Sequence, residues 1–217
     1  MESQTEIVTK GKNPSLIGMF TSPGEQFERI KQVPKIWVPL LIVSILYVVG
    51  MTLIAMSMDV STLIGEEIPK EQVEIVLGFA KVTMIITGII TPIFAVLISS
   101  AIQLIITKIA SSPATFKQLF SMNTYIMVIG AVGLTLNAVI RYVIGGNPEI
   151  SVTSLAGLLN QEKAGILSSF EVFSIWATVV TAIGLHKTAQ LSKGLAWTIA
   201  IVFFLIGIGF TFIGSLF

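Results

Sequence analysis

Three ionisable residues, Lys81, Arg141 and Glu171, lie within or at the ends of long apolar stretches. An ionisable group inside a membrane is costly, and it marks either a buried ion pair or a path for protons and ions. Lys81 and Arg141 are therefore the candidate partners of Glu171 in a buried polar cluster. The alternative is that Glu171 is protonated or reaches outer water, while the two cations extend to the membrane surface.

Other residue types that carry chemistry are scarce in this sequence. It has no cysteine and a single histidine, His186, which excludes thiolate sites and leaves too few ligands for a zinc centre. No HExxH, Walker or GxSxG motif is present. The net charge of +1 gives no basic surface for nucleic acid. We therefore expect no catalytic, cofactor-binding or metal site, and we expect that the protein is not an enzyme.

The elements that hold these residues are five apolar stretches with charges almost only between them. Charged residues make up 12% of the 217 residues, against about 25% in soluble domains. A stretch of about 20 apolar residues crosses the hydrocarbon core as a helix. The sequence predicts an all-α polytopic membrane protein with five transmembrane helices, at about 36–58, 75–107, 118–140, 164–185 and 194–217.

Two features of these spans bear on the site. Pro92 interrupts the long second span, and we expect one kinked helix rather than a re-entrant pair. Glu171 would lie seven residues into the fourth span, about 10 Å along its helix. The amides Gln103, Asn123 and Asn137 fall within spans, where such groups more often link helices than bind substrates.

The positive charges are unevenly distributed between the two sides of the predicted bundle. Nine of the thirteen Lys and Arg residues precede the first span or lie in the second–third and fourth–fifth connections. Because Lys and Arg accumulate on the cytoplasmic side, we expect a cytoplasmic N-terminus and an extracytoplasmic C-terminus. The expected location is a bacterial plasma membrane.

The segment before the first span combines a polar tail with a short amphipathic helix. Residues 1–14 are polar and without periodicity, so we expect a disordered cytoplasmic tail followed by one membrane domain over 15–217. Ser22, Pro23 and Glu25 resemble a capping box with proline at the first helical position. The helix would lie in the membrane interface as an anchor, or present a docking surface to a cytoplasmic partner through Phe20, Phe27 and Ile30.

Several motifs, in order and spacing, resemble the Yip domain, named for Ypt/Rab-interacting proteins. They are Phe20–Phe27 with Ile30 and Pro34 before the first span, Thr115–Phe120 with Tyr125 at the third, and Phe173–Trp176, Ile183–Leu185 and Leu191–Ala196 around the fourth. The resemblance covers nearly everything from residue 15 onward. It implies five helices, a cytoplasmic N-terminus and no catalytic residues.

Two functions follow from these observations. The short region before the first span resembles the short bacterial members of the family, some of which are associated with ABC exporters and assist their assembly. We therefore expect a non-enzymatic protein in the lipid bilayer that binds a membrane-protein partner laterally or associates with itself. The alternative is a small transporter or channel that uses Glu171 and Lys81 within the bundle.

Overall fold

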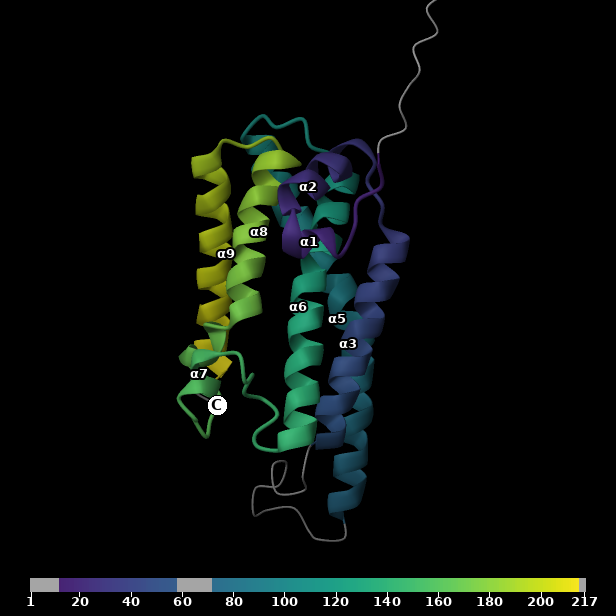
Figure 1. Cartoon of the computed structure of the whole chain (residues 1–217), viewed down its shortest axis with the longest axis vertical. Coiled ribbons are helices and arrows are strands. Elements are labelled where there is room, and N and C mark those ends of the chain that lie inside the picture. Colours follow the sequence, from purple (N-terminus) through teal and green to yellow (C-terminus); the bar gives the residue numbers. More distant parts are fainter. Residues whose placement is uncertain (1–11, 58–71, 215–217) are drawn as a thin grey trace, which may run out of the picture.

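The computed structural model describes residues 12–57 and 72–214. Within these residues the regular elements are helices, and none is a strand. Five of the helices are apolar and run alternately up and down side by side (Figure 1). This confirms the predicted all-α polytopic membrane architecture. In chain order they are α3 (Trp37–Ser57), α5 (Val73–Ile109), α6 (Phe116–Ile144), α8 (Val172–Lys187) and α9 (Lys193–Gly214).

The two ends of the bundle carry different connections. At one end lie α1 (Gly18–Thr21), α2 (Pro23–Gln32) and the α5–α6 and α8–α9 connections (Figure 1). We call this the α2 end. The opposite end carries α7 (Leu155–Leu158) within the α6–α8 connection, and we call it the α7 end.

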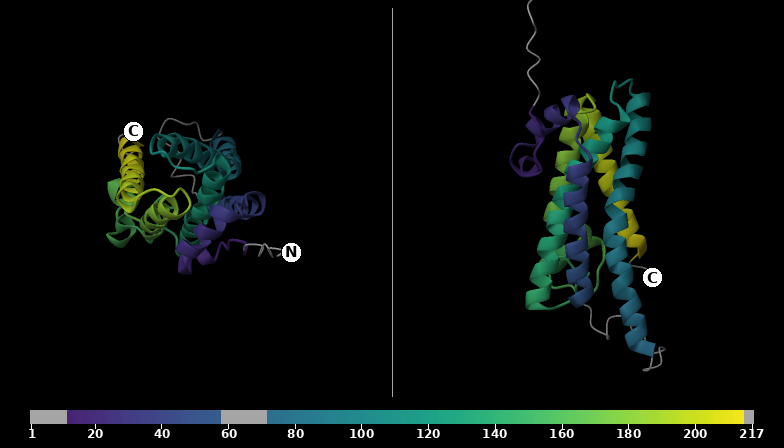
Figure 2. Two further views of the ribbon diagram at one scale, coloured as in Figure 1. Left: turned by 90° about the horizontal axis from the view of Figure 1, so that it is seen from above. Right: turned by 90° about the vertical axis from the view of Figure 1, so that its right-hand side faces the viewer.

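The second predicted span is a single helix. α5 continues through Pro92 for 37 residues, which corresponds to about 55 Å. That length exceeds the hydrocarbon core of ~30 Å. The first turns of α5 extend past the other helices at the α7 end (Figure 2). The prediction of one helix through Pro92, rather than a re-entrant pair, is therefore confirmed.

The fourth predicted span is shorter than expected and begins later. α8 has 16 residues, or about 24 Å, and a 3₁₀ turn (Ile166–Ser169) precedes it. Glu171 lies in extended backbone (φ −112°, ψ 140°) and is the N-cap of α8, so its predicted place seven residues inside the helix is wrong. A carboxylate accepts hydrogen bonds from free N–H groups at a helix N-terminus, whereas in the helix interior it would face lipid unpaired.

The N-terminal segment packs on the bundle instead of extending away from it. Residues 1–11 of the predicted tail lie outside the described residues, as do residues 215–217 at the end of the fifth span. Pro14, by contrast, is buried, and its carbonyl accepts a hydrogen bond of 3.2 Å from the Tyr125 hydroxyl of α6. Pro14, the last residue of the predicted tail, is therefore packed against the bundle.

Helix α2 has the predicted start but not the predicted capping box. Ser22 is the N-cap and Pro23 is the first helical residue, yet no side chain caps the helix. The Ser22 hydroxyl accepts a hydrogen bond from the Gln26 side chain, and Glu25 forms an ion pair with Arg29 one turn later. The i,i+4 ion pair uses the carboxylate that a capping box would need.

Helix α6 is the centre of the bundle. Its buried residues lie along most of its length and include Leu119, Met122 and Ile129, each with no exposed surface. A Cβ at Gly133 would lie 2.7 Å from Cγ of Phe173, so only glycine allows α6 and α8 to approach so closely here.

The helices around α6 are packed unevenly. α3 packs closely against both α5 and α6, while α9 packs against α8 and the 3₁₀ turn. α5 and α9 make at most marginal contact, and their ribbons stand apart in the view from above (Figure 2). The helices are therefore closely packed on the α3 side of the bundle, whereas α5 and α9 are not packed against each other.

Candidate functional site

A cluster of polar side chains lies between α5 and α6. The Asn123 amide nitrogen donates to Ser100 Oγ at 3.0 Å and to Gln103 Oε1 at 2.8 Å. All three residues are buried, with exposed fractions of 9%, 0% and 2%. These bonds confirm that Asn123 and Gln103 link two helices, as the sequence predicted. We call these three residues the amide cluster.

The amide cluster has unused hydrogen-bonding capacity. Among the described residues, neither Asn123 Oδ1 nor Gln103 Nε2 has a hydrogen-bond partner. One is an acceptor and the other a donor. Both residues line a cavity of about 250 Å³.

This cavity lies between α5 and α9, which make at most marginal contact with each other. Its lining comes from α5, α6, α8 and α9, including Thr178, Thr181 and Phe204. The Thr178 and Thr181 hydroxyls are already bonded to the carbonyls of Ser174 and Ala177 within α8. The apolar walls and the polar floor together form what we call the α5–α9 cleft.

A second polar network holds the α7 end together. Asn137 Nδ2 donates to the Gly133 carbonyl at 2.9 Å and to the Thr153 hydroxyl at 2.8 Å. Asn137 Oδ1 accepts the backbone N–H of Thr153 at 3.1 Å. The Thr153 hydroxyl in turn donates to Glu171 Oε1 at 2.5 Å. We call this set the Asn137 network, and it fastens the α6–α8 connection to both helices.

Glu171 has its hydrogen bonds satisfied within the Asn137 network. Its Oε2 accepts the backbone N–H of Ser174 at 2.8 Å, and a short bridge pairs its backbone with Ser154. Both carboxyl oxygens act as hydrogen-bond acceptors at the start of α8. The side chain is 7% exposed.

The structure does not bring Lys81, Arg141 and Glu171 together. Within the described residues, neither cation forms an ion pair with Glu171. Arg141 Nε donates to the Ile150 carbonyl at 3.0 Å. Lys81 lies on α5, which packs against α3 and α6 rather than α8. The hydrogen bonds that Glu171 forms at the start of α8 take the place of the expected ion pair.

The predicted docking residues are used by the chain itself. Phe27 and Ile30 have no exposed surface, because α2 packs against α6 and α8. A Cβ at Gly184 would lie 3.0 Å from the Phe27 ring, so α8 receives that ring closely. Phe20 is partly buried and packs against the same core. Phe27 and Ile30 are therefore not available to a partner in this structure.

Only some residues of these two polar networks were predicted from the sequence. The amides within spans were visible as polar residues in apolar stretches. Ser100 carried no such signal because hydroxyls are common in membrane helices, and Thr153 lies outside the predicted spans. The described residues hold no group of three or more His, Asp or Glu side chains able to bind a metal ion.

Comparison with known proteins gives two matches of long coverage. The sequence model of the Yip1 domain matches residues 17–214. Membrane protein YknW of Bacillus subtilis (strain 168) is 36% identical over 214 residues, which covers 96% of this chain and 93% of that protein. No solved structure matches the chain significantly.

Proposed function

The chain belongs to the Yip1 domain family of membrane proteins, and on that premise we propose that it is a non-enzymatic protein that binds another membrane protein laterally. The α5–α9 cleft is the proposed binding surface. The observation that carries this proposal is the free acceptor of Asn123 and free donor of Gln103, both within a membrane-spanning bundle.

A transmembrane helix with one polar side chain fits this cleft best. Unsatisfied amide groups in hydrocarbon are costly, and bonds between helices relieve them. The partner helix would pack on the apolar side chains that line the cleft, among them Val96 of α5 and Phe203 and Phe204 of α9. A hydroxyl or amide on that helix would pair with Asn123 and Gln103.

The proposed partner is the membrane-spanning part of a transporter of the ABC-exporter type, or another membrane complex. Support comes from the resemblance of the chain to short bacterial members of the family. Self-association through the same cleft is the other form of lateral binding. In either case the protein would assist assembly or function and would catalyse no reaction.

We infer that the α2 end faces the cytoplasm of a bacterial cell and that the membrane is the plasma membrane. The support is the surplus of Lys and Arg in the segments at that end over those at the α7 end. Cysteines introduced at Ser111 and Asn160, which lie in connections at opposite ends, test this inference. Labelling of Ser111→Cys by an impermeant reagent in intact cells would contradict it.

Site-specific photo-crosslinking in native membranes tests the partner-binding proposal. A photoreactive residue placed at Phe204 faces the α5–α9 cleft, while one at Leu205 lies at the same depth, is 57% exposed and does not line the cavity. We expect a defined membrane-protein adduct from position 204 alone, identified by mass spectrometry. We expect Asn123→Leu to reduce that adduct at least severalfold.

Two results would contradict the proposal. One is the same set of adducts from positions 204 and 205, because random collision in the bilayer would then explain both. The other is an adduct from position 204 whose yield does not change in the Asn123→Leu protein. Lipid adducts alone from position 204 would argue that the cleft is occupied by lipid.

A transport path through Glu171 and Lys81 is the alternative function, and it has less support. The two residues do not meet in the bundle, and Glu171 is held by Thr153 and Ser174. Solute uptake into proteoliposomes that is lost in Glu171→Gln would favour this alternative over lateral binding.

A further inference from the structure

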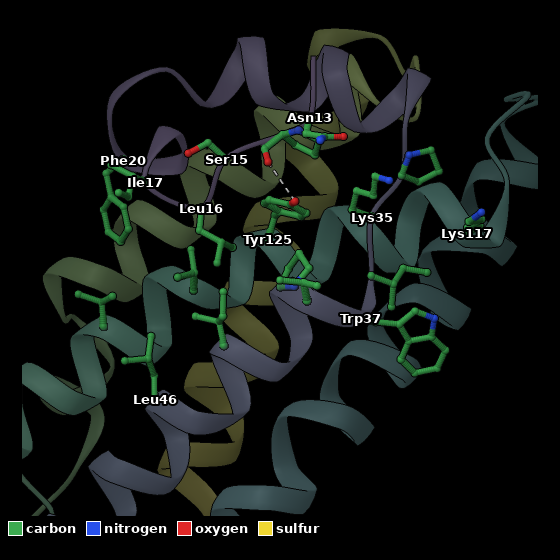
Figure 3. Close-up of a pocket in the computed structure, with 18 residues that line it drawn as sticks. Asn13, Ser15, Leu16, Ile17, Phe20, Lys35, Trp37, Leu46, Lys117 and Tyr125 are labelled. Carbon is green, nitrogen blue, oxygen red and sulfur yellow. Dashed lines mark hydrogen bonds between the residues drawn. The ribbon is translucent and has the colours of Figure 1, made fainter. Parts of the chain in front are cut away.

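An apolar groove of about 1040 Å³ lies beside α6 at the α2 end, apart from the α5–α9 cleft. Tyr125, Val128 and Val132 of α6 form its floor. One wall is the N-terminal segment with Leu16, and the other is the first half of α3 (Figure 3). The volume lies at the upper end of the ~300–1,000 Å³ typical of small-molecule sites.

Both walls of this groove are fastened to the floor. The Tyr125 hydroxyl donates to the Pro14 carbonyl at 3.2 Å, which holds the N-terminal wall. The Ser121 hydroxyl donates to the Lys35 carbonyl at 2.6 Å, which holds the chain just before α3. The groove is therefore a built feature of the fold rather than a gap between loosely placed segments.

The depth of the groove matches one leaflet of a bilayer. On α3 its lining extends from Trp37 to Leu46, about 14 Å along the helix axis. Half of a hydrocarbon core of ~30 Å is about 15 Å. Trp37 is 82% exposed at the start of α3, as expected for an aromatic residue at the membrane surface.

Two cations lie at the shallow end of the groove. Lys35 precedes α3 and Lys117 is in the first turn of α6, and both line the groove. Figure 3 shows them on the same side as Trp37, with Ile17 and Phe20 toward the other side. Neither lysine has an ion-pair partner among the described residues. The groove is thus apolar along its length and positively charged at headgroup level.

We propose that this groove binds one anionic phospholipid from the leaflet at the α2 end, with its headgroup beside Lys35 and Lys117 and its acyl chain along α3 and α6. A basic pocket between transmembrane helices matches an anionic headgroup. The apolar floor matches an acyl chain, whereas an extended peptide would leave its backbone groups unpaired there. The inference depends on membrane embedding and not on partner binding at the α5–α9 cleft.

Native mass spectrometry of the full chain in mild detergent tests this site. The probes are phosphatidylglycerol and phosphatidylcholine with identical acyl chains, added together in equal amounts. We expect one phosphatidylglycerol bound per chain, with about tenfold preference over phosphatidylcholine, since each lysine near an anionic headgroup favours it. Lys35→Ala with Lys117→Ala should remove most of that preference.

Matched variants distinguish binding in the groove from effects of any lysine at this end and of any bulky side chain on α3. Lys108→Ala with Lys193→Ala removes two exposed lysines at the same end that do not line the groove, and it should leave the preference intact. Ile42→Trp fills the groove and should reduce retention of both lipids. Leu41→Trp, which is at the same depth but outside the lining, should not.

Three results would overturn the proposal. Equal retention of the two lipids by the unaltered protein would show that the lysines do not select a headgroup. Equal loss in the two lysine pairs would show a non-specific surface effect. Retention unchanged by Ile42→Trp would show that the lipid lies elsewhere. Monodisperse elution of each variant is required, so that unfolding is not read as loss of the site.

Discussion

Asn123 and Asn137 lie on the same helix, 14 residues apart, yet their surroundings differ. Asn137 donates to Gly133 and Thr153 and accepts from Thr153, so both ends of its amide are paired within the chain. Asn123 donates to Ser100 and Gln103, but its oxygen has no hydrogen-bond partner among the described residues, and the residue lines the cavity. The Asn137 amide therefore stabilises the fold, whereas the Asn123 oxygen can still accept a hydrogen bond from another molecule.

The packing around the two amides explains the difference. The α6–α8 connection folds back over Asn137 and supplies Thr153 and Glu171. Near Asn123, α9 packs on α8 and makes at most marginal contact with α5, so no element covers that side of the cluster. A polar residue in a membrane bundle is therefore structural or available according to which helices surround it, and residue type alone does not decide.

Asn137→Ala should have the largest effect on stability. The change removes bonds that join α6 to the α6–α8 connection and leaves the Thr153 N–H without its acceptor. We expect a loss of about 2 kcal/mol in the free energy of unfolding. Unfolding by SDS in mixed micelles measures it. A loss smaller than that of Asn123→Ala would contradict the proposed division of roles.

Glu171→Ala should come next, because it removes the N-cap of α8. Loss of a capping side chain typically costs about 1 kcal/mol. Glu171→Gln keeps one acceptor oxygen and should recover part of that loss. If the Gln and Ala variants unfold at the same denaturant concentration, the carboxylate does not act as a cap.

Asn123→Ala should destabilise the protein only modestly. Hydrogen bonds between membrane helices average about 0.6 kcal/mol, and the wild-type cluster is already half unpaired. The same variant should lose the crosslinked partner described above. A large stability loss with unchanged crosslinking would make Asn123 a structural residue like Asn137.

Lys81→Ala should have the smallest effect, within about 0.5 kcal/mol, since its side chain forms no ion pair with a described residue. A double-mutant cycle with Glu171→Ala measures any coupling between the two. Coupling above about 1 kcal/mol would restore the buried ion pair that the sequence suggested.

The fold was largely predictable from the sequence, and its main local error is the start of α8. The apolar stretches placed α3, α5, α6 and α9 within a few residues. The start of α8 was misplaced because the apolar residues before Glu171 form a 3₁₀ turn within the α6–α8 connection, and the backbone of Glu171 pairs with Ser154 in the same connection. Hydropathy measures preference for lipid, and it does not distinguish a helix from an extended chain that is covered by protein.

Sequence alone determined that most of this protein lies in lipid, because the free energy of transfer into lipid is a sum of side-chain contributions along each stretch. It also determined which residues were costly to place there. Only the tertiary structure decided which partners each of these polar residues has. The Thr153 hydroxyl donates to Glu171, α2 buries its apolar face against α6 and α8, and the Asn123 oxygen stays unpaired among the described residues. These outcomes depend on contacts between residues far apart in the chain.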